Sequence, residues 1–384
     1  MNKRIYVCHT YYHVYISCLK ELRAEHPDRG HATLLLSLIS TDFGDLKTRL
    51  TASGLFAEVH EFDEKNHDFF PELQKYRAKR GNVLRHMINR IIFCKKLGKA
   101  QIPYLPVDFR AYSDIYVYCD SDPIGYYLNY AKIPYHALED GLDCLANFDA
   151  ARVDNRGFFG IKTWMSGKNL IFIQNGYGKY CLDMEVNDIS VIKYPGPHYI
   201  AVSRNELAAG LDEAAKGMLC DIFIADMAQL RQKLAAYAGP TVLLLTQPLC
   251  DIETRKRIFT DAIDQYGQPS PVTPAPPHND TDQTAAATEA PNPATEDPAP
   301  ARVIIKPHPM DELDYPALFP KHVVLDGKFP MEILNFIPGL YFDRVVAVFT
   351  VPTSLQQVGE AIYLGSDFIK EYEDTCRYSP NELL

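Results

Sequence analysis

Residues 4–39 read RIYVCHTYYHVYISCLKELRAEHPDRGHATLLLSLI, and this stretch decides the fold. The apolar runs 4–8 and 32–39 have the length of buried strands, and residues 12–25 between them repeat apolar side chains at helical spacing. A strand, a helix and a second strand in this order are typical of a parallel unit whose strands are covered on both faces.

The same alternation continues along the chain. Strands are predicted at residues 57–62, 114–119 and 135–138, with 169–173 as a late strand or hairpin. They recur at 199–202, 241–246, 303–306, 323–325 and 345–349, with helices at 123–131, 205–236 and 252–265. The run Tyr194-Pro195-Gly196-Pro197 interrupts the pattern. We therefore predict an α/β fold of two facing Rossmann-like domains with a cleft between them. The predicted domains are residues 1–195 and 196–365, and a tail, 366–384, packs back on the first domain.

Composition excludes several classes of protein. The net charge of −10 argues against a nucleic-acid-binding protein. The nine cysteines are scattered without a CxxC pair, so neither a zinc site nor a disulfide framework is predicted. No apolar run reaches the ~18 residues of a membrane span. We expect a cytoplasmic protein with reduced thiols.

Residues 268–300 differ from the rest of the chain. Proline and alanine fill 16 of these 33 positions, and five acidic residues occur there without any Lys or Arg. Such a segment buries too little apolar surface to offset the entropy of ordering. It is interpreted as a disordered insertion, either a tolerated surface loop or a partner-binding segment.

Residues 75–99 form a basic segment. Nine Lys and Arg residues occur there, and no acid lies between Leu73 and Val107. Apolar residues recur beneath them at helical spacing. One interpretation is a solvated basic helix that packs its apolar face on the core. The other is a peripheral docking surface for an anionic glycan or an anionic membrane.

Two short motifs follow predicted strands in opposite domains. Glu139-Asp140-Gly141 follows residues 135–138, where one carboxylate can face the cleft while the other braces the loop. Lys306-Pro307-His308-Pro309 follows residues 303–305, and its two prolines restrict the loop that presents the imidazole. Both lie at carboxyl ends of strands, where ligands bind in open α/β sheets. Each also has a simpler interpretation, as an acidic turn and as a solvated strand end.

Other polar residues follow the same strand ends. Thr353 and Ser354 are predicted to cap a helix at 355–364, which would form a phosphate site. Glu332 is predicted to open another helix, and Asp120 contacts an acceptor or caps the next helix. His9, Tyr11, Tyr12 and His13 place rings at the edge of the cleft or are ordinary helix residues. The remaining candidate site residues are Gly141, Thr246, Gln247, Lys306 and Pro309.

Known cofactor motifs are missing from the sequence. There is neither a GxGxxG motif nor a Walker loop. The Asp and His residues show no spacing typical of metal ligands. A dehydrogenase, a kinase and a metalloenzyme are therefore disfavoured.

The order of these motifs resembles that of bacterial sialyltransferases with the GT-B fold. Glycosyltransferase family 52, the lipooligosaccharide sialyltransferases, is the nearest resemblance, and capsular polysialyltransferases share the motifs. The resemblance runs from Tyr6 to Ser354 and rests on Glu139-Asp140-Gly141, Lys306-Pro307-His308-Pro309, Phe329-Pro330-Met331-Glu332 and Thr353-Ser354. The departures are the insertion 268–300 and a Thr-Ser pair where some relatives have two serines.

The resemblance implies an inverting, metal-independent transfer of sialic acid from CMP-sialic acid to a hydroxyl of a cell-surface glycan. Asp140 would be the general base, and His308 would bind or protonate the departing phosphate. Thr353 and Ser354 would donate hydrogen bonds to the phosphate, and Glu332 would hold the ribose. Thr246 or Gln247 would line the nucleotide pocket. A homodimer is one expectation from the resemblance, since the residues leave the oligomeric state open.

One requirement and several alternatives remain at this point. A carboxyl with an ordinary pKa near 3.9 is a weak base, so the pKa of Asp140 is expected to be raised by burial or by Glu139. Other GT-B transferases that use CMP-Kdo or CDP-glycerol are alternatives. A sugar-nucleotide-binding protein without catalysis is another.

Overall fold

The computed structural model describes residues 3–24, 30–77, 82–235, 237, 239–267, 301–350 and 352–372. These residues form two compact units. Unit 1 consists of Met1–Met227 and Lys328–Pro338, and unit 2 consists of Ala228–Gly327 and Gly339–Glu373. The domain boundary predicted from the sequence was residue 195. The insertion 268–300, Lys79, Arg80 and residues 373–384 of the predicted tail lie outside the described residues.

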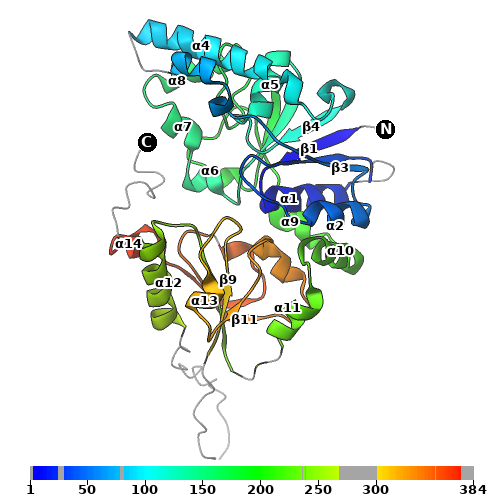
Figure 1. The fold of residues 1–384 in the computed structure, drawn as a ribbon, viewed down its shortest axis with the longest axis vertical. Coiled ribbons are helices and arrows are strands. Elements are labelled where there is room, and N and C mark those ends of the chain that lie inside the picture. Colours follow the sequence, from blue (N-terminus) through cyan, green and yellow to red (C-terminus); the bar gives the residue numbers. More distant parts are fainter. Residues whose placement is uncertain are drawn as a thin grey trace, which may run out of the picture. The chain divides into compact units, whose positions relative to one another are not determined.

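Unit 1 is built on a seven-stranded sheet with the order β3-β2-β1-β4-β5-β6-β7, in which every pair of neighbours is parallel (Figure 1). Parallel strands are buried on both faces, and all five residues of β2 are buried. The strands are β1 Arg4–Cys8, β2 Thr33–Ser37, β3 Glu58–Phe62, β4 Asp114–Val117, β5 Tyr135–Leu138, β6 Cys181–Val186 and β7 Tyr199–Ala201.

Helices cover this sheet in two groups, and Figure 1 shows them on its opposite faces. The first group packs α1, α2, α9 and α10 together, and the second packs α4 against α5. Thr10 caps α1, since its side chain accepts a hydrogen bond from the backbone N–H of His13. The helices are α1 Tyr11–Leu22, α2 Leu46–Ser53, α3 Gln74–Arg77, α4 Val83–Ala100, α5 Pro123–Ala131, α6 Cys144–Asn147, α7 Ala150–Asp154, α8 Phe159–Gly167, α9 Arg204–Ala209 and α10 Glu213–Phe223. The short 3-10 helices are η1 His67–Phe69, η2 Pro71–Leu73, η3 Ile102–Tyr104, η4 Phe109–Ala111, η5 Ile189–Val191 and η6 Met331–Phe336.

Unit 2 has a five-stranded parallel sheet with the order β10-β9-β8-β11-β12. Its central strands β8 and β9 are almost wholly buried. The strands are β8 Thr241–Leu245, β9 Arg302–Lys306, β10 Val323–Val324, β11 Phe342–Ala347 and β12 Val358–Tyr363. The helices are α11 Met227–Lys233, α12 Ile252–Tyr266, α13 Tyr315–Leu318 and α14 Gly365–Ile369, with the 3-10 helix η7 Pro352–Ser354.

The structure corrects three predicted elements. Residues 169–173 form a loop, and the strand beside β5 is β6. The helix predicted at 205–236 is divided into α9, α10 and α11, with a break at Gly210. The helix predicted at 355–364 is absent, because Val358–Tyr363 forms strand β12 against β11. Hydrogen bonding to a neighbouring strand overrides local helical spacing in such a short segment.

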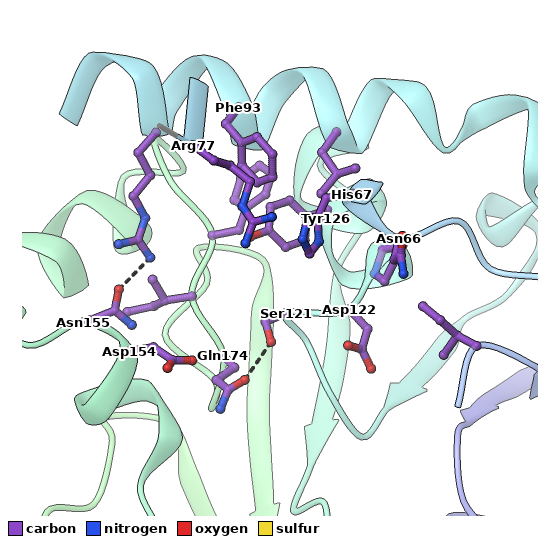
Figure 2. Close-up of a pocket in the computed structure, with 16 residues that line it drawn as sticks. Asn66, His67, Arg77, Phe93, Ser121, Asp122, Tyr126, Asp154, Asn155 and Gln174 are labelled. Carbon is purple, nitrogen blue, oxygen red and sulfur yellow. Dashed lines mark hydrogen bonds between the residues drawn. The ribbon is translucent and has the colours of Figure 1, made fainter. Parts of the chain in front are cut away.

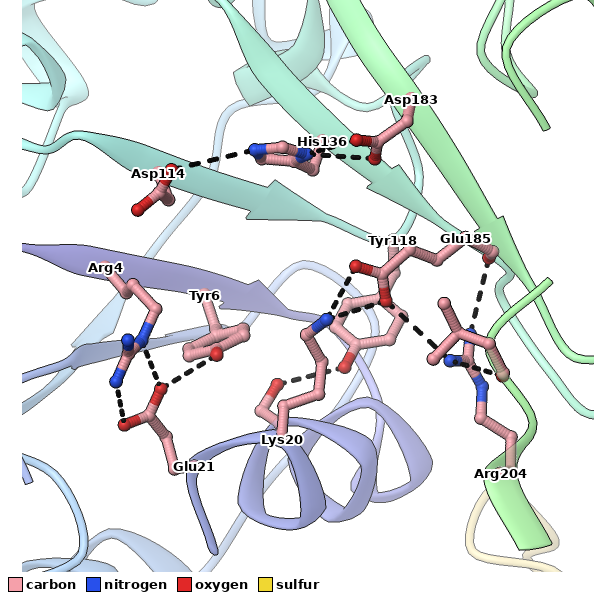
Figure 3. Close-up of polar contacts among 12 residues, drawn as sticks. Arg4, Tyr6, Lys20, Glu21, Asp114, Tyr118, His136, Asp183, Glu185 and Arg204 are labelled. Carbon is pink, nitrogen blue, oxygen red and sulfur yellow. Dashed lines mark hydrogen bonds and ion pairs between the residues drawn. The ribbon is translucent and has the colours of Figure 1, made fainter. Parts of the chain in front are cut away.

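Buried ion pairs connect α1 to the sheet of unit 1 (Figure 3). Lys20 Nζ lies 2.6 Å from Glu185 Oε1 of β6, and Arg204 Nη1 lies 3.9 Å from the same carboxylate. Glu21 accepts hydrogen bonds from Tyr6 of β1 and from Arg4. A buried charge is tolerated only when it is paired, so these contacts fix how α1 lies on the sheet. Within the described ranges, no helix has the length and apolar content of a membrane span.

Close packing of α4 on α5 generates a stability prediction. A Cβ atom added at Gly98 of α4 would lie 2.5 Å from the carbonyl oxygen of Tyr126. We expect Gly98→Ala to lower the free energy of unfolding by about 1–3 kcal/mol, because the helices must separate. Gly217→Ala in α10 is the matched control, since no atom lies within 4 Å of its added Cβ. Helix propensity should make that variant up to about 1 kcal/mol more stable. Denaturant unfolding measures the free energy of unfolding of both variants, and an equal change in the two would contradict the packing argument.

Candidate functional site

The switch point of unit 1 lies between β1 and β4, where the strand order reverses direction. Ligands in open α/β sheets bind at such a point, beyond the carboxyl ends of the strands. His9 follows β1, and Asp120, Ser121 and Asp122 follow β4. The Glu139-Asp140-Gly141 loop follows β5, the next strand in the sheet. The structure therefore brings together the polar residues that the sequence placed at separate strand ends of the first domain.

Glu64, which follows β3, connects three segments at this edge. Its carboxylate accepts hydrogen bonds from Ser37 Oγ at 2.7 Å and from the backbone N–H of Ile124 at 2.7 Å. His9 Nε2 lies 2.8 Å from the same carboxylate and 3.4 Å from Asp122. The sequence prediction missed Glu64, because an isolated glutamate after an edge strand has no distinguishing pattern.

His9 is a buried cation. Burial alone would lower the pKa of its imidazole, but the hydrogen bond and charge of Glu64, with the charges of Asp122 and Asp140, raise the pKa to about 9. Its Nδ1 atom is buried and has no hydrogen-bond partner within the described part of the chain. A protonated Nδ1 is a donor, so a bound polar molecule would satisfy it.

Glu139 and Asp140 have the divided roles that the sequence suggested. Glu139 is buried and accepts hydrogen bonds from the backbone N–H groups of Leu145 at 3.0 Å and Asn187 at 2.8 Å. Glu139 therefore braces the loop. It had been predicted to contact a substrate, but its carboxylate is not placed to do so. The carbonyl of Gly141 accepts from the N–H of Cys144, which begins α6. Asp140 is left with 60% of its side chain exposed.

His13 of α1 stabilises the ionised form of Asp140. His13 Nδ1 accepts a hydrogen bond from the backbone N–H of His9, so its proton lies on Nε2. Nε2 then donates to the Asp140 carboxylate at 2.7 Å and to the Asp140 carbonyl at 2.9 Å. The ring also stacks on Tyr118, with 4.1 Å between centroids. From the sequence, His13 was named as a ring at the cleft edge or an ordinary helix residue, but it was not predicted as a site residue.

The expected rise in the pKa of Asp140 is wrong. Desolvation would raise the pKa, but the hydrogen bond and electrostatic interaction with His13, together with the charge of His9, outweigh it and lower the pKa below the ordinary value. Asp140 is therefore a fully ionised carboxylate at neutral pH. It can accept a proton or a hydrogen bond without first being deprotonated.

Two other predicted contact residues are part of the framework. Asp120 is 2% exposed and accepts hydrogen bonds from the N–H groups of Asn175 and Gly176 and from the Tyr135 hydroxyl. Its role is therefore to hold the 175–176 loop, not to contact an acceptor. Tyr11 is also buried and donates to the carbonyl of Asp42. Tyr12 is half-buried, and desolvation and the charge of Glu332 raise the pKa of its hydroxyl well above the ordinary value.

A pocket of about 370 Å³ lies beside this edge of unit 1 (Figure 2). Asp122 and Ser121, from the loop after β4, line one part of it. Aromatic rings of Phe93 and Tyr126 and the guanidinium groups of Arg77 and Arg90 line another part. Flat rings beside fixed polar groups suit a sugar, which has apolar faces and hydroxyl edges. The other lining residues are Ile39, Asn66, His67, Leu97, Pro123, Asp154, Asn155, Phe172, Ile173 and Gln174.

Unit 2 has its own switch point, between β8 and β11. Gln247, after β8, accepts a hydrogen bond through Oε1 from the N–H of Phe349, after β11, at 2.9 Å. Thr246 is buried, and its Oγ1 accepts from the N–H of His308 at 3.2 Å. These two predicted nucleotide contacts therefore hold the strand ends and the His308 loop in place.

The loop after β9 presents His308 on a fixed backbone. Lys306 is buried, and its Nζ donates to the carbonyls of Pro307 at 2.9 Å and Gly327 at 3.0 Å. It is thus neither a solvated strand end nor placed to contact a phosphate. Asp311, past Pro309, pairs with Arg255 of α12 at 2.6 Å. That ion pair anchors the far side of the loop.

His308 is neutral at neutral pH. Burial and the nearby charge of Lys306 lower the pKa of its imidazole to about 4, against the opposing charge of Asp311. The N–H of Met310 donates to His308 Nδ1 at 3.2 Å, so the single ring proton lies on Nε2. His308 can thus donate one hydrogen bond from Nε2, and an arriving phosphate would raise the pKa again.

The remaining candidates lie apart from their predicted setting. Thr353 is exposed and Ser354 is buried, both in the 3-10 helix η7 and not at the start of an α-helix. The predicted helix N-terminus for phosphate is therefore lost. Glu332 is buried in η6, which belongs to unit 1 and packs on α10. Its charge acts on Tyr12 and Tyr15 of α1. Among the described residues, no group of three or more His, Cys, Asp or Glu side chains is arranged to hold a metal ion.

The chain was compared with known proteins. No family model matches it, and no curated protein matches it. Similar folds occur among solved structures, including a 2,6-sialyltransferase from the Vibrionaceae bacterium Photobacterium sp. JT-ISH-224, in complex with donor product CMP and acceptor substrate lactose. That protein is 10% identical, with 98% of this chain and 74% of its own chain covered and a TM-score of 0.50.

Two further structures extend the comparison. An α/β-galactoside α-2,3-sialyltransferase from Photobacterium phosphoreum is 11% identical, with 94% and 90% of the two chains covered and a TM-score of 0.48. A UDP-GlcNAc 2-epimerase from Neisseria meningitidis is 8% identical, with 90% and 77% covered and a TM-score of 0.40. Such identities show the fold alone. The predicted fold class, two parallel-sheet α/β domains as in GT-B enzymes, is confirmed.

The contact between His13 and Asp140 is testable. In His13→Phe the ring still stacks on Tyr118, but the donor to Asp140 is removed. Desolvation then acts unopposed by this hydrogen bond, so the pKa of the Asp140 carboxyl should rise by about one unit or more. The carboxyl ¹³C titration measures this value in labelled protein. His60→Phe, a change at a partly exposed histidine of β3, is the control and should leave the pKa of Asp140 unchanged. An unchanged Asp140 in His13→Phe would refute the assignment.

Proposed function

We propose that the chain is an inverting glycosyltransferase that moves sialic acid from CMP-sialic acid to a hydroxyl of a cell-surface glycan. We also propose that it belongs to glycosyltransferase family 52. The observation that carries the proposal is Asp140, an exposed and ionised carboxylate on a braced loop, near enough for its charge to act on Asp122 of the sugar-sized pocket. The fold shared with a sialyltransferase that binds CMP and lactose supports it.

Unit 1 would handle the acceptor. The acceptor sugar would lie in the 370 Å³ pocket, with its faces on Phe93 and Tyr126. Its reacting hydroxyl would donate a hydrogen bond to Asp140. Asp140 would take the hydroxyl proton as the oxygen attacks the anomeric carbon. A base that is already ionised needs no prior deprotonation, although a low pKa makes it weak.

Unit 2 would handle the leaving nucleotide. His308 Nε2–H would donate to the phosphate of CMP, and the exposed Thr353 hydroxyl would add a second hydrogen bond. Glu332, which belongs to unit 1, stays the proposed partner of the ribose. As the anomeric C–O bond breaks, CMP departs with the bonding electrons, and the new glycosidic bond forms on the opposite face. The oxocarbenium-like transition state would be stabilised without a metal ion, because fixed donors receive the charge on the phosphate.

Donor screening tests the reaction itself. We expect CMP release from CMP-sialic acid in the presence of a galactose- or sialic-acid-terminated acceptor, with and without EDTA. Little nucleotide should be released from CMP-Kdo or CDP-glycerol. Asp140→Asn still accepts the His13 hydrogen bond but cannot take a proton, so kcat should fall by about 100-fold or more. Glu72→Gln, an exposed carboxylate elsewhere in unit 1, is the control. Release from another donor alone, or full activity in Asp140→Asn, would overturn the proposal.

The protonation state of His308 makes a second prediction. Because the pKa of His308 lies near 4 in the absence of ligand, the neutral ring should act as a hydrogen-bond donor to the phosphate. His308→Gln keeps an N–H donor and should bind CMP about 5- to 10-fold more tightly than His308→Ala. Equilibrium binding at pH 7.5 compares the two. Equal affinities would contradict a hydrogen bond from a neutral donor at this position to the phosphate.

A further inference from the structure

Two helices of unit 1 expose large apolar side chains. On α4, Val83, Leu84 and Ile88 are exposed, with Leu84 at 67%. At the start of α8 and along it, Phe158, Ile161 and Trp164 are exposed, with Phe158 and Trp164 each at 60%. Single exposed apolar residues are ordinary, but a group of this size marks an interaction site. We call these six residues and the cations around them the α4–α8 surface.

The two helices form one rigid support. Phe93 and Leu97 of α4 share a buried cluster with Met165 of α8. Arg90 Nη2 donates to Asn155, before α8, at 2.6 Å, and Lys95 donates to the carbonyl of Asn169, after it. The contacts on both sides of α8 fix it beside α4. Phe93 and Leu97 of α4 and Met165 of α8 are buried, whereas the six apolar residues named above are exposed.

Positive charge surrounds these apolar side chains. Exposed cations on or next to the two helices are Lys75, Arg77, Arg85, Lys96, Lys99, Arg156 and Lys168, and the acid Asp154, before α8, is also exposed. Residues 74–106 contain no Asp or Glu, whereas the whole chain carries a net charge of −10. The cations are thus concentrated here in an otherwise acidic protein. An anionic partner is therefore favoured.

We propose that the α4–α8 surface docks on an anionic lipid bilayer. A hydrated anionic glycan would pair with the cations but would leave Leu84, Ile88 and Trp164 in water. A bilayer satisfies both features, because acidic headgroups attract Lys and Arg while apolar side chains enter the interface. Tryptophan is favoured at the membrane interface. Such docking would hold unit 1 against a membrane on which lipid-linked glycans are displayed.

The chain carries its own probe for this proposal, since Trp164 is its single tryptophan. The full chain is titrated with vesicles of phosphatidylcholine and phosphatidylglycerol in equal amounts. We expect the emission of Trp164 to shift to shorter wavelength and to be quenched when brominated lipids are included. Vesicles of pure phosphatidylcholine should have little effect, and added salt should weaken the binding.

Variants separate the two components of the surface. Leu84→Ser with Ile88→Ser should reduce vesicle binding by about tenfold or more. Lys96→Glu with Lys99→Glu should reduce it by about 25-fold or more, at about fivefold for each cation lost. The matched controls are Leu182→Ser, an exposed leucine on β6, and Lys193→Glu, an exposed lysine elsewhere in unit 1. Both controls should bind vesicles normally. Flotation on a density gradient gives a second readout.

Several outcomes would overturn the proposal. One is binding to a soluble anionic polysaccharide without quenching by brominated lipid. Another is association of the chain with itself that is lost in Leu84→Ser with Ile88→Ser. Equal binding of the surface variants and their controls is a third. All four variants lie outside the proposed catalytic residues, so CMP release with a soluble acceptor should be unchanged. Failure of docking is thereby distinguished from failure of the proposed reaction.

Discussion

The bracing of the loop after β5 by Glu139 is the interaction on which the rest of the candidate site depends. Its two carboxylate oxygens accept backbone N–H groups from Leu145 and Asn187, on the two sides of the loop. Desolvation raises the pKa of this buried carboxyl, and those hydrogen bonds oppose the rise. With Glu139 held inward, its neighbour Asp140 must turn outward, because adjacent side chains at a strand end point in different directions.

Other buried carboxylates hold loops in place around the sheet of unit 1, as Glu139 does. Glu64 joins the ends of β2 and β3 to the start of α5, and Asp120 holds the loop at 175–176. In unit 2, Asp311 and Lys306 hold the His308 loop in the same manner. Each of these charges is buried with several partners, which is the condition for tolerating a buried charge. Asp140 and Thr353, by contrast, are exposed, and both are among the groups proposed to contact a ligand.

The histidines at the two strand edges have opposite protonation states. In unit 1, carboxylates around His9 keep that imidazole protonated, while His13 keeps Asp140 ionised. In unit 2, burial and Lys306 keep His308 neutral. An ionised carboxylate suits a proton acceptor, and a neutral imidazole in a cationic setting suits an anionic phosphate. This division of charge agrees with the division of labour in the proposed transfer.

The sequence by itself determined the α/β class, most strands and the strand-end positions of Asp140 and His308, because apolar periodicity and chain-local turns record them. It failed for β6 and β12, which depend on pairing with neighbouring strands, and for the helix expected after Ser354. Only the tertiary structure decided which polar residues are buried. Glu139, Asp120 and Lys306 look equivalent to Asp140 and His308 in sequence. Their roles follow from hydrogen-bond partners up to 56 residues away, and no local pattern encodes those.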